Sequence, residues 1–321
     1  MTDTGYTFRT QDYILTCSVH HGLTKDAEDY LVIDAIDGDG SQLTIPERIE
    51  ISSYDVAGNR MVRELPVRGI GKKAGLGKKG LTRIVCGKNL LFMDDWAFAQ
   101  CDNLLQVIMT SPDAVNQFRF AKGVFEDCRK LRSIAADADE AGALGYLLGV
   151  LPCRMQAEYL LTGDDIGSAH WYEKWDQRLM SYLDEDDEEG YTNVVLCGEE
   201  DIQRSVHGFA EDKRKSKAAL CLIRLCHPLL LQDLYRERMQ AYLLAHTKGE
   251  ETEEAWMVLL EEFADELSYF KMFAQIGAIH SENVDDMIVD MDDRSTETKA
   301  FVMRYKQEHL QTADVFDEFE L

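Results

Sequence analysis

Apolar side chains follow two different spacings in this chain, and the spacing changes near residue 138. Before that point, short segments rich in β-branched and aromatic residues alternate with turn-forming residues, which is typical of strands. After it, apolar residues recur three or four positions apart, as in the run from Leu144 to Leu151, which predicts amphipathic helices. The pattern predicts an α+β chain with a strand-rich N-terminal domain over residues 1–136 and a helical domain over 137–321.

Three stretches of the strand-rich part repeat the same order of residues, and they begin at Ile70, Met93 and Phe120. The second and third copies align at an offset of 27, and the first and second at an offset of 23, with Gly75 in the position of Phe98. The aligned apolar positions are Phe98 with Phe125, Cys101 with Cys128, Leu81 with Leu104 and Leu131, and Ile84 with Val107 and Ile134. One such unit cannot bury its apolar faces alone, so the repeat predicts a solenoid of stacked coils.

The repeated residues resemble the BspA-like class of leucine-rich repeats, whose units read roughly I-G-x-x-A-F-x-x-C-x-x-L-x-x-I-x-I-P. The resemblance covers about residues 40–136 and rests on Ile70-Gly71, Ala97-Phe98, Cys101, Leu104, Cys128 and Leu131. Gly75 departs from the pattern, and the Ile-Pro pair after Val107 is absent. The resemblance implies a short leucine-rich-repeat β-solenoid.

Two β-rich segments precede the repeats, at residues 13–19 and 30–36, and the turn-forming run DGDG follows the second of them. We expect these segments to form a hairpin that covers the open end of the first coil, because an uncovered solenoid end exposes its apolar core.

The helical part predicts several helices of about 10–16 residues joined by short connections, arranged as a helical repeat or bundle. Residues 267–291 and 295–310 resemble degenerate ankyrin-type helix hairpins, although the T-P-L-H signature is absent. The acidic run DEDDEE, residues 184–189, predicts a solvated loop.

The chain has 34 basic and 59 acidic side chains, a net charge of −25, and most of the excess lies after residue 150. A field of this sign repels phosphate backbones and anionic membranes, so we expect neither nucleic acid nor membrane as a partner. Four lysines form the one basic patch that the sequence singles out, and we hypothesise that they dock an acidic partner or the protein's own acidic half. They are Lys72, Lys73, Lys78 and Lys79.

The cysteines and the first residues together predict a cytoplasmic protein. The chain begins MTDTGYTFRTQDY, with no basic stretch before an apolar run, which argues against a signal peptide. No apolar run approaches the ~18 residues of a membrane span. The eight cysteines include no C-x-x-C pair, so we expect reduced thiols rather than disulfides or a zinc site.

Two loops imitate known ligand sites but lack the required context. Gly75, Gly77 and Gly80 spell G-x-G-x-x-G, yet the segment LTRIV that follows is strand-like, whereas a dinucleotide loop opens a helix. Asp37, Asp39 and Ser41 imitate the start of a calcium loop. Its sixth and twelfth positions, however, hold Gln42 and Arg48 where glycine and glutamate are needed. We therefore expect turns at both places.

No combination of residues indicates catalysis. The histidines form no H-E-x-x-H motif, and adjacent residues such as His20 and His21 face opposite sides of a strand. Repeat packing accounts for Cys101 and Cys128, and no G-x-S-x-G element is present. We expect no catalytic residue, no metal and no cofactor.

The leading hypothesis is a non-enzymatic interaction module or adaptor that holds an unknown protein partner on its repeat surfaces. Two alternatives remain open at this point. One is an enzyme or small-ligand-binding protein with a cleft at the junction of the two domains, near residues 136–165. The other is a structural protein that associates with copies of itself.

Overall fold

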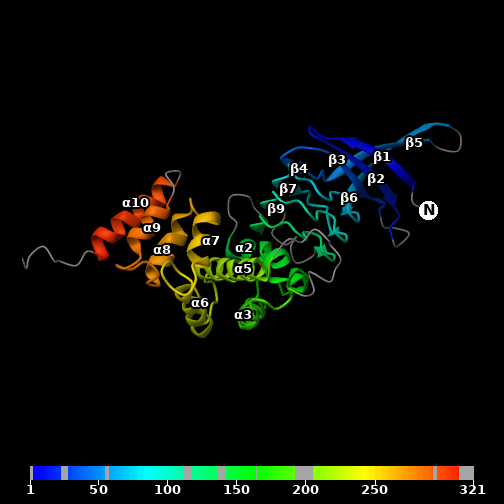
Figure 1. Cartoon of the computed structure of the whole chain (residues 1–321). Coiled ribbons are helices and arrows are strands. Elements are labelled where there is room, and N and C mark those ends of the chain that lie inside the picture. The colour runs from blue at the N-terminus through cyan, green and yellow to red at the C-terminus, as the bar shows by residue number, and fades with distance from the viewer. Residues whose placement is uncertain are drawn as a thin grey trace, which may run out of the picture. The chain divides into compact units, whose positions relative to one another are not determined.

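A computed structural model describes residues 3–22, 28–54, 58–110, 118–135, 142–163, 165–191, 205–291 and 295–310. Strands make up the first part of the chain and helices the second (Figure 1). The strands are β1 (Asp3–Arg9), β2 (Tyr13–His20), β3 (Tyr30–Gly38), β4 (Gln42–Thr44), β5 (Arg48–Tyr54), β6 (Arg60–Ile70), β7 (Arg83–Cys86), β8 (Phe92–Met93), β9 (Gln106–Met109), β10 (Arg119–Phe120) and β11 (Ser133–Ala135). The helices are α2 (Ala143–Gly149), η1 (Leu151–Met155), η2 (Glu158–Leu161), α3 (Ala169–Asp184), α5 (Val206–Cys226), α6 (Asp233–Ala245), α7 (Glu254–Glu262), α8 (Leu267–Gln275), α9 (Val284–Asp290), α10 (Thr296–Tyr305) and η3 (Lys306–Leu310). The predicted α+β class is confirmed.

The chain forms two compact units, Met1–Trp175 and Asp176–Leu321. Strands give way to helices between β11 and α2, close to the predicted point, but the division between the units lies later, within α3. The reason is that the first helices pack on the strand-rich part. Trp171 and Trp175, at the start of α3, donate their indole N–H groups to the carbonyls of Leu160 and Leu147, at 2.9 and 3.2 Å.

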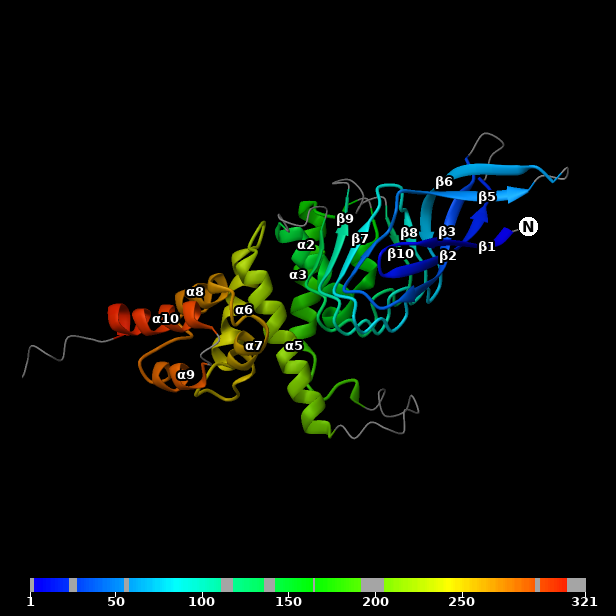
Figure 2. The same ribbon diagram turned by 90° about the horizontal axis from the view of Figure 1, so that it is seen from above.

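Two parallel ladders of short strands form the sides of the coils. On one side β3, β6, β8 and β10 pair in that order, and on the other β4, β7, β9 and β11. The inward register partners are Ile33, Ile70, Met93 and Phe120 on the first side and Leu43, Ile84, Val107 and Ile134 on the second. These side chains are buried, so the predicted solenoid is confirmed. Its coils are seen from above in Figure 2. A first coil through Leu43 precedes the three aligned stretches.

The aligned phenylalanines occupy equivalent interior positions. Phe98 and Phe125 are both fully buried, and their rings stack with centroids 6.4 Å apart and planes 14° apart. Gly75 takes the same position in the preceding coil. A Cβ built there would lie 2.6 Å from the Phe98 ring, so the ring of the next coil uses the space that a side chain would need.

Cysteine thiols form a row of hydrogen bonds that runs from coil to coil. The Cys101 thiol donates to the carbonyl of Gly75 at 3.4 Å, and the Cys128 thiol donates to that of Phe98 at 3.1 Å. Cys153 continues the pattern from the helical turn η1, where its thiol donates to the carbonyl of Phe125 at 3.1 Å. The helical end of this unit therefore replaces a further coil.

The N-terminal strands extend the sheet on one side of the first coil. β2 and β3 pair antiparallel, β1 adds a strand beside β2, and β3 pairs in parallel with β6. The DGDG turn leads from β3 into β4. β5 and the first part of β6 form an antiparallel hairpin inserted between the first two coils, which extends beyond the sheet in Figure 2.

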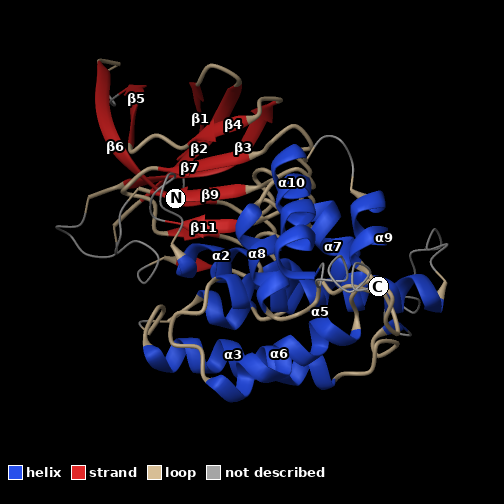
Figure 3. Ribbon diagram, turned by 90° about the vertical axis from the view of Figure 1, so that its left-hand side faces the viewer, coloured by secondary structure: helices blue, strands red, loops and turns tan. Residues whose placement is uncertain are grey.

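Helix α2 covers the last coil and lies beside β11 in Figure 3. Two glycines four residues apart face the strand. A Cβ at Gly145 would lie 2.9 Å from that of Ala135, and one at Gly149 would lie 2.6 Å from the Arg132 carbonyl. The helix can approach the strand this closely because both residues lack side chains. The edge of the sheet is thereby protected from pairing with other chains.

The second unit packs around α5, which contacts α6, α7 and α8, while α10 contacts α8 and α9. The residues of α5 from Ala218 to Leu222 are fully buried. Among the described helices, none has both the length and the apolar character needed to cross a membrane.

The acidic run DEDDEE ends α3 and continues as a loop with four of its six residues exposed, as predicted, but two of its carboxylates are partly buried. Glu185 and Asp187 pair with lysines on α5, at 3.2 Å to Lys213 and 2.7 Å to Lys217. Both lysines also donate to backbone carbonyls at the end of α3, where the helix dipole favours cations. The run therefore ties α3 to α5, because alternate carboxylates of the run point toward the buried basic face.

Candidate binding surface on the coils

The last three coils each turn through two left-handed backbone positions at the same places in the repeat. Lys73, Trp96 and Gly123 are equivalent, with φ angles of 58°, 54° and 63°. The second set is Gly77, Gln100 and Asp127, with φ angles of 71°, 59° and 59°. Only glycine adopts this region without strain, so the stacking of the coils holds Lys73 and Trp96 in a costly conformation.

The three glycines of G-x-G-x-x-G each have a structural reason. Gly75 leaves room for the Phe98 ring, and Gly77 occupies a left-handed position. At Gly80 a Cβ would lie 2.7 Å from the Asp39 carboxylate, which places part of the calcium-like loop against this turn. The segment leads into strand β7 and not into a helix. Among the described residues, no group of three His, Cys, Asp or Glu side chains is arranged to hold a metal ion.

The structure divides the four lysines of the basic patch into two pairs. Lys79 is paired with Asp102, and the Lys78 ammonium donates to the carbonyl of Gly38 at 3.1 Å. The ammonium groups of Lys72 and Lys73 lie instead 5.0 and 5.6 Å from the ring centroid of Trp96. Both are exposed, and no ion pair involving either is present in the described part of the chain.

Contacts with the next coil hold Trp96 in place. Its indole N–H donates to the Glu126 carboxylate at 2.7 Å. The indole also fills the space over Gly123, where a Cβ would lie 2.7 Å from Nε1. Gly123 in turn donates its N–H to the Glu158 carboxylate at 3.2 Å. Trp96 is not among the predicted site residues, although its alignment with Lys73 and Gly123 in the repeat is a signal that the sequence contains.

A second cation lies over an aromatic ring close by. The Arg119 guanidinium is 5.2 Å from the ring centroid of Phe92 and pairs with Asp94 at 3.3 Å. Phe92 covers Gly69, where a Cβ would lie 2.1 Å from its ring. Gly69, Phe92 and Arg119 are equivalent positions of three coils, as their strand register shows.

We call this face the Trp96 surface. It consists of Lys72, Lys73, Phe92, Trp96, Arg119 and Lys122. Its cations are exposed and its rings half-buried. The excess of positive charge also extends beyond this surface. Residues 58–135 contain fourteen basic and seven acidic side chains, in a chain that is otherwise strongly acidic. Positive charge is therefore concentrated on the coils.

Four of the described thiols are unsuited to nucleophilic chemistry, and Cys101, whose pKa is lowered by the hydrogen bond with the Cys128 thiol, is fully buried. Burial raises the pKa of Cys17, Cys86, Cys153 and Cys226 to about 12, so these groups are neutral thiols near pH 7. The seven described cysteines are free, and Cys197 lies outside the described residues. The two adjacent histidines are separated as expected: His20 stacks on Tyr30, and His21 pairs with Asp29.

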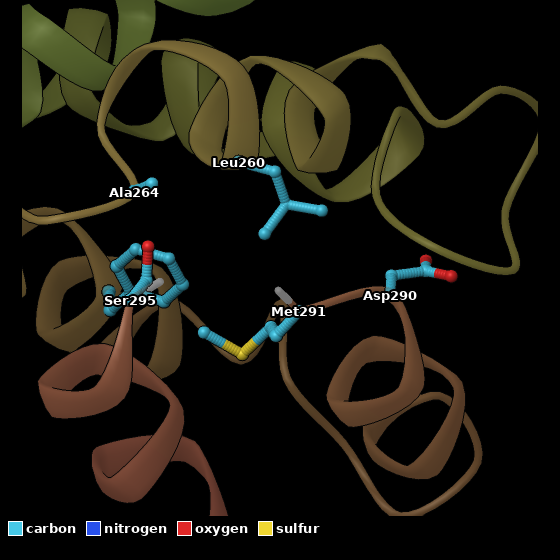
Figure 4. Close-up of a pocket in the computed structure, with 6 residues that line it drawn as sticks. Leu260, Ala264, Asp290, Met291 and Ser295 are labelled. Carbon is cyan, nitrogen blue, oxygen red and sulfur yellow. The ribbon is translucent and has the colours of Figure 1, made fainter. Parts of the chain in front are cut away.

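The second unit contains a small hollow lined by Leu260, Ala264, Phe270, Asp290, Met291 and Ser295 (Figure 4). Its volume is about 60 Å³, whereas small-molecule sites usually measure about 300–1,000 Å³. The Asp290 carboxylate already binds the Trp256 indole and the Lys248 ammonium, each at 3.0 Å. The hollow is a packing gap between helices that holds a few water molecules at most.

No protein-family model matches this sequence, and no match is found among curated proteins. Solved structures do match. A leucine rich cell surface protein from Faecalibacterium prausnitzii is 18% identical with a TM-score of 0.29, over 41% of this chain and 32% of that one. A leucine-rich repeat protein from Bacteroides ovatus is 19% identical with a TM-score of 0.27, over 40% and 29%. Another from Bacteroides capillosus is 18% identical with a TM-score of 0.24, over 41% and 99%. The chain thus spans about a third of the length of the first two proteins.

Proposed function

We propose that this protein is a non-enzymatic interaction module that holds a partner polypeptide on the face of its coils. The Trp96 surface carries the proposal. It brings Lys72, Lys73, Phe92, Trp96 and Arg119 together from three successive coils, with cations positioned over aromatic rings. Aromatic rings and arginine are the side chains that most often dominate the energy of protein interfaces.

The buried thiols and the small hollow of the second unit support a binding role over a catalytic one. Reaction chemistry needs an activated nucleophile or a cavity of substrate size. Burial keeps thiols such as Cys153 protonated, and the hollow is far smaller than a site for a small molecule. The adaptor hypothesis needs neither feature, because an exposed surface is sufficient for it.

The proposal also covers the helical unit and the location of the protein in the cell. We infer that α8, α9 and α10 form degenerate ankyrin-type hairpins that add a second interaction surface. We also place the protein in the cytoplasm, which the free state of the seven described cysteines supports.

A quantitative pull-down tests the proposed function. The purified full chain is the bait in lysate of the cells that make it, and captured proteins are quantified by mass spectrometry. Trp96→Ala and Phe92→Ala remove the rings of the Trp96 surface, and Tyr159→Ala removes a ring that is 61% exposed outside it. We expect a partner that the first two variants lose and the control retains. An identical set of captured proteins for all the baits would contradict the proposal.

A further inference from the structure

We propose that the Trp96 surface recognises an acidic polypeptide segment in which an aromatic side chain lies between carboxylates. This inference rests on the proposed function and adds the chemistry of the partner. Its basis is the alternation of charge and aromatic character from coil to coil. Cations of one coil, Lys72 and Lys73, and of another, Arg119 and Lys122, lie on either side of the coil that carries Phe92 and Trp96.

The spacing of the coils sets the spacing of the partner's side chains. Lys72, Asp95 and Lys122 are equivalent positions of three coils, and the Lys122 N–H donates to the Asp95 carboxylate at 3.2 Å. Neighbouring strands lie about 4.8 Å apart, so the two lysines are about 10 Å apart along the stack. An extended peptide covers that distance in about three residues. A segment that crosses the coils could place carboxylates three residues apart on the lysines and an aromatic ring between them.

Lys72 and Lys73 are positioned before any partner arrives. Stacking on Trp96 restricts the Lys72 and Lys73 ammonium groups, and the hydrogen bond to Glu126 fixes the indole in turn. An ammonium over a ring keeps donors free for a carboxylate. Side chains that are already ordered lose less entropy on binding, which favours a short peptide as ligand.

Carboxylates within the same face favour a polypeptide over a phosphate polymer. Asp94 pairs with Arg119, Asp95 accepts from the Lys122 backbone, and Glu126 holds the Trp96 indole. A nucleic acid carries charge at every phosphate and would meet these groups as well as the net charge of −25. A peptide that alternates acidic and aromatic residues can set its carboxylates on the cations alone.

Fluorescence anisotropy with the full chain tests the inference. The probe is a fluorescein-labelled nonapeptide of three Glu-Glu-Phe repeats, and the comparison peptide has three Glu-Glu-Gly repeats. We expect the aromatic peptide to bind, and the glycine peptide to bind at least about tenfold more weakly because no ring reaches Phe92 and Trp96. Unlabelled oligothymidylate should not displace the probe. No binding of the aromatic peptide at 50 mM salt overturns the inference, as does tighter binding of oligothymidylate.

Two double variants with the same change in net charge distinguish binding at this site from non-specific electrostatic attraction. Lys72→Gln with Lys73→Gln removes the cations over Trp96, and we expect the Kd to rise about tenfold. Lys79→Gln with Lys88→Gln removes two exposed lysines that are paired with Asp102 and Glu47, and the Kd should change less than about twofold. An equal rise in Kd for the two double variants would show that the position of the lysines is irrelevant, and it would overturn the inference.

The pull-down and the peptide experiment can fail separately. A captured partner that needs Phe92 and Trp96, combined with no peptide binding, leaves the proposed function in place and removes the acidic partner. A peptide that binds as expected while no partner depends on the two rings contradicts the proposed function itself.

Discussion

The indole of Trp96 lies directly over Gly123, and both residues are in the left-handed backbone region, with φ angles of 54° and 63°. A side chain at position 123 and the indole cannot share this space. Gly123 therefore links the stability of the coils to the candidate surface. It lets the coils stack, and it also supports the ring on which Lys72 and Lys73 lie.

Gly123→Ala is therefore expected to destabilise the protein through two separate effects. A left-handed alanine costs about 1–2 kcal/mol, and the overlap with the indole adds about 1–3 kcal/mol. Gly77→Ala is the matched control, because Gly77 has φ of 71° and nothing lies within 4 Å of its Cβ position. Urea unfolding should show the larger loss for Gly123→Ala, and equal losses would mean that the indole does not occupy this space.

The contact between α2 and β11 leads to a second comparison of glycines. Alanine normally stabilises a helix by about 1 kcal/mol relative to glycine. At Gly149, however, the new methyl group would meet the backbone of Arg132 and Ser133 at 2.6 Å, and backbone atoms cannot move aside cheaply.

We expect Gly149→Ala to lower the unfolding free energy by about 1–3 kcal/mol in spite of its better helix propensity. Displacement of α2 would also uncover the edge of β11, so light scattering should detect more association. At Gly142, before the helix, a Cβ has nothing within 4 Å, and Gly142→Ala should be nearly neutral. A stabilised Gly149→Ala protein would contradict the close packing.

The repeat was predictable from the sequence because every coil places the same kinds of side chain inside. The offsets of 23 and 27 that align Ile84, Val107 and Ile134 are the register of their strands. The coil through Leu43 lies within the family resemblance but outside the aligned copies, because the β5–β6 hairpin separates it from the next by 41 residues. Spacing reveals a repeat only where insertions are absent.

The candidate surface could be predicted only in part. A cluster of lysines is visible in the sequence, but the sequence does not show that Lys79 faces Asp102 while Lys72 and Lys73 face Trp96. These partners belong to other coils and are fixed by the stacking. The ion pairs of the acidic run at 184–189 could not be predicted for the same reason, since its partners Lys213 and Lys217 lie on a helix distant in sequence.

A buried ion pair in the second unit gives a further prediction. Asp176 and Arg224 are 1% and 0% exposed, and two hydrogen bonds of 2.6 and 3.0 Å join them. Burial raises the pKa of Asp176, and the guanidinium only partly offsets this effect. Removing one partner leaves a buried charge, so Asp176→Asn or Arg224→Met should each cost about 3–5 kcal/mol.

The double variant Asp176→Asn with Arg224→Met should be clearly more stable than the sum of the single losses predicts, because no unpaired charge remains. The exposed pair of Asp184 and Arg238 is the control, and its removal should change stability by only about 0–1 kcal/mol. If the losses of stability from Asp176→Asn and Arg224→Met were additive, the two groups would not interact.

Thiol reactivity tests the burial of the cysteines. In protein carrying Cys197→Ser, the remaining cysteines should react very slowly with a thiol reagent at pH 8, because burial raises the pKa of thiols such as Cys153 and Cys226 to about 12. All seven should react at once in urea. Rapid reaction of more than two thiols in the folded protein would contradict the burial of the other five.

Stability should also fall on mild acidification because of His246, at the end of α6. Burial lowers the pKa of His246, and the opposing effect of Glu254 is smaller. The folded protein thus binds a proton less readily than the unfolded chain, whose histidines titrate near about 6.5. The stabilising contribution is present above that pH and is lost as pH falls toward the lower pKa of the folded state.

Urea midpoints measured from pH 8 to pH 5 should decline, and His246→Asn should make the decline shallower. His309→Asn, at a ring that is 59% exposed, should leave it unchanged. A decline of the same steepness in His246→Asn would assign the pH dependence to other groups.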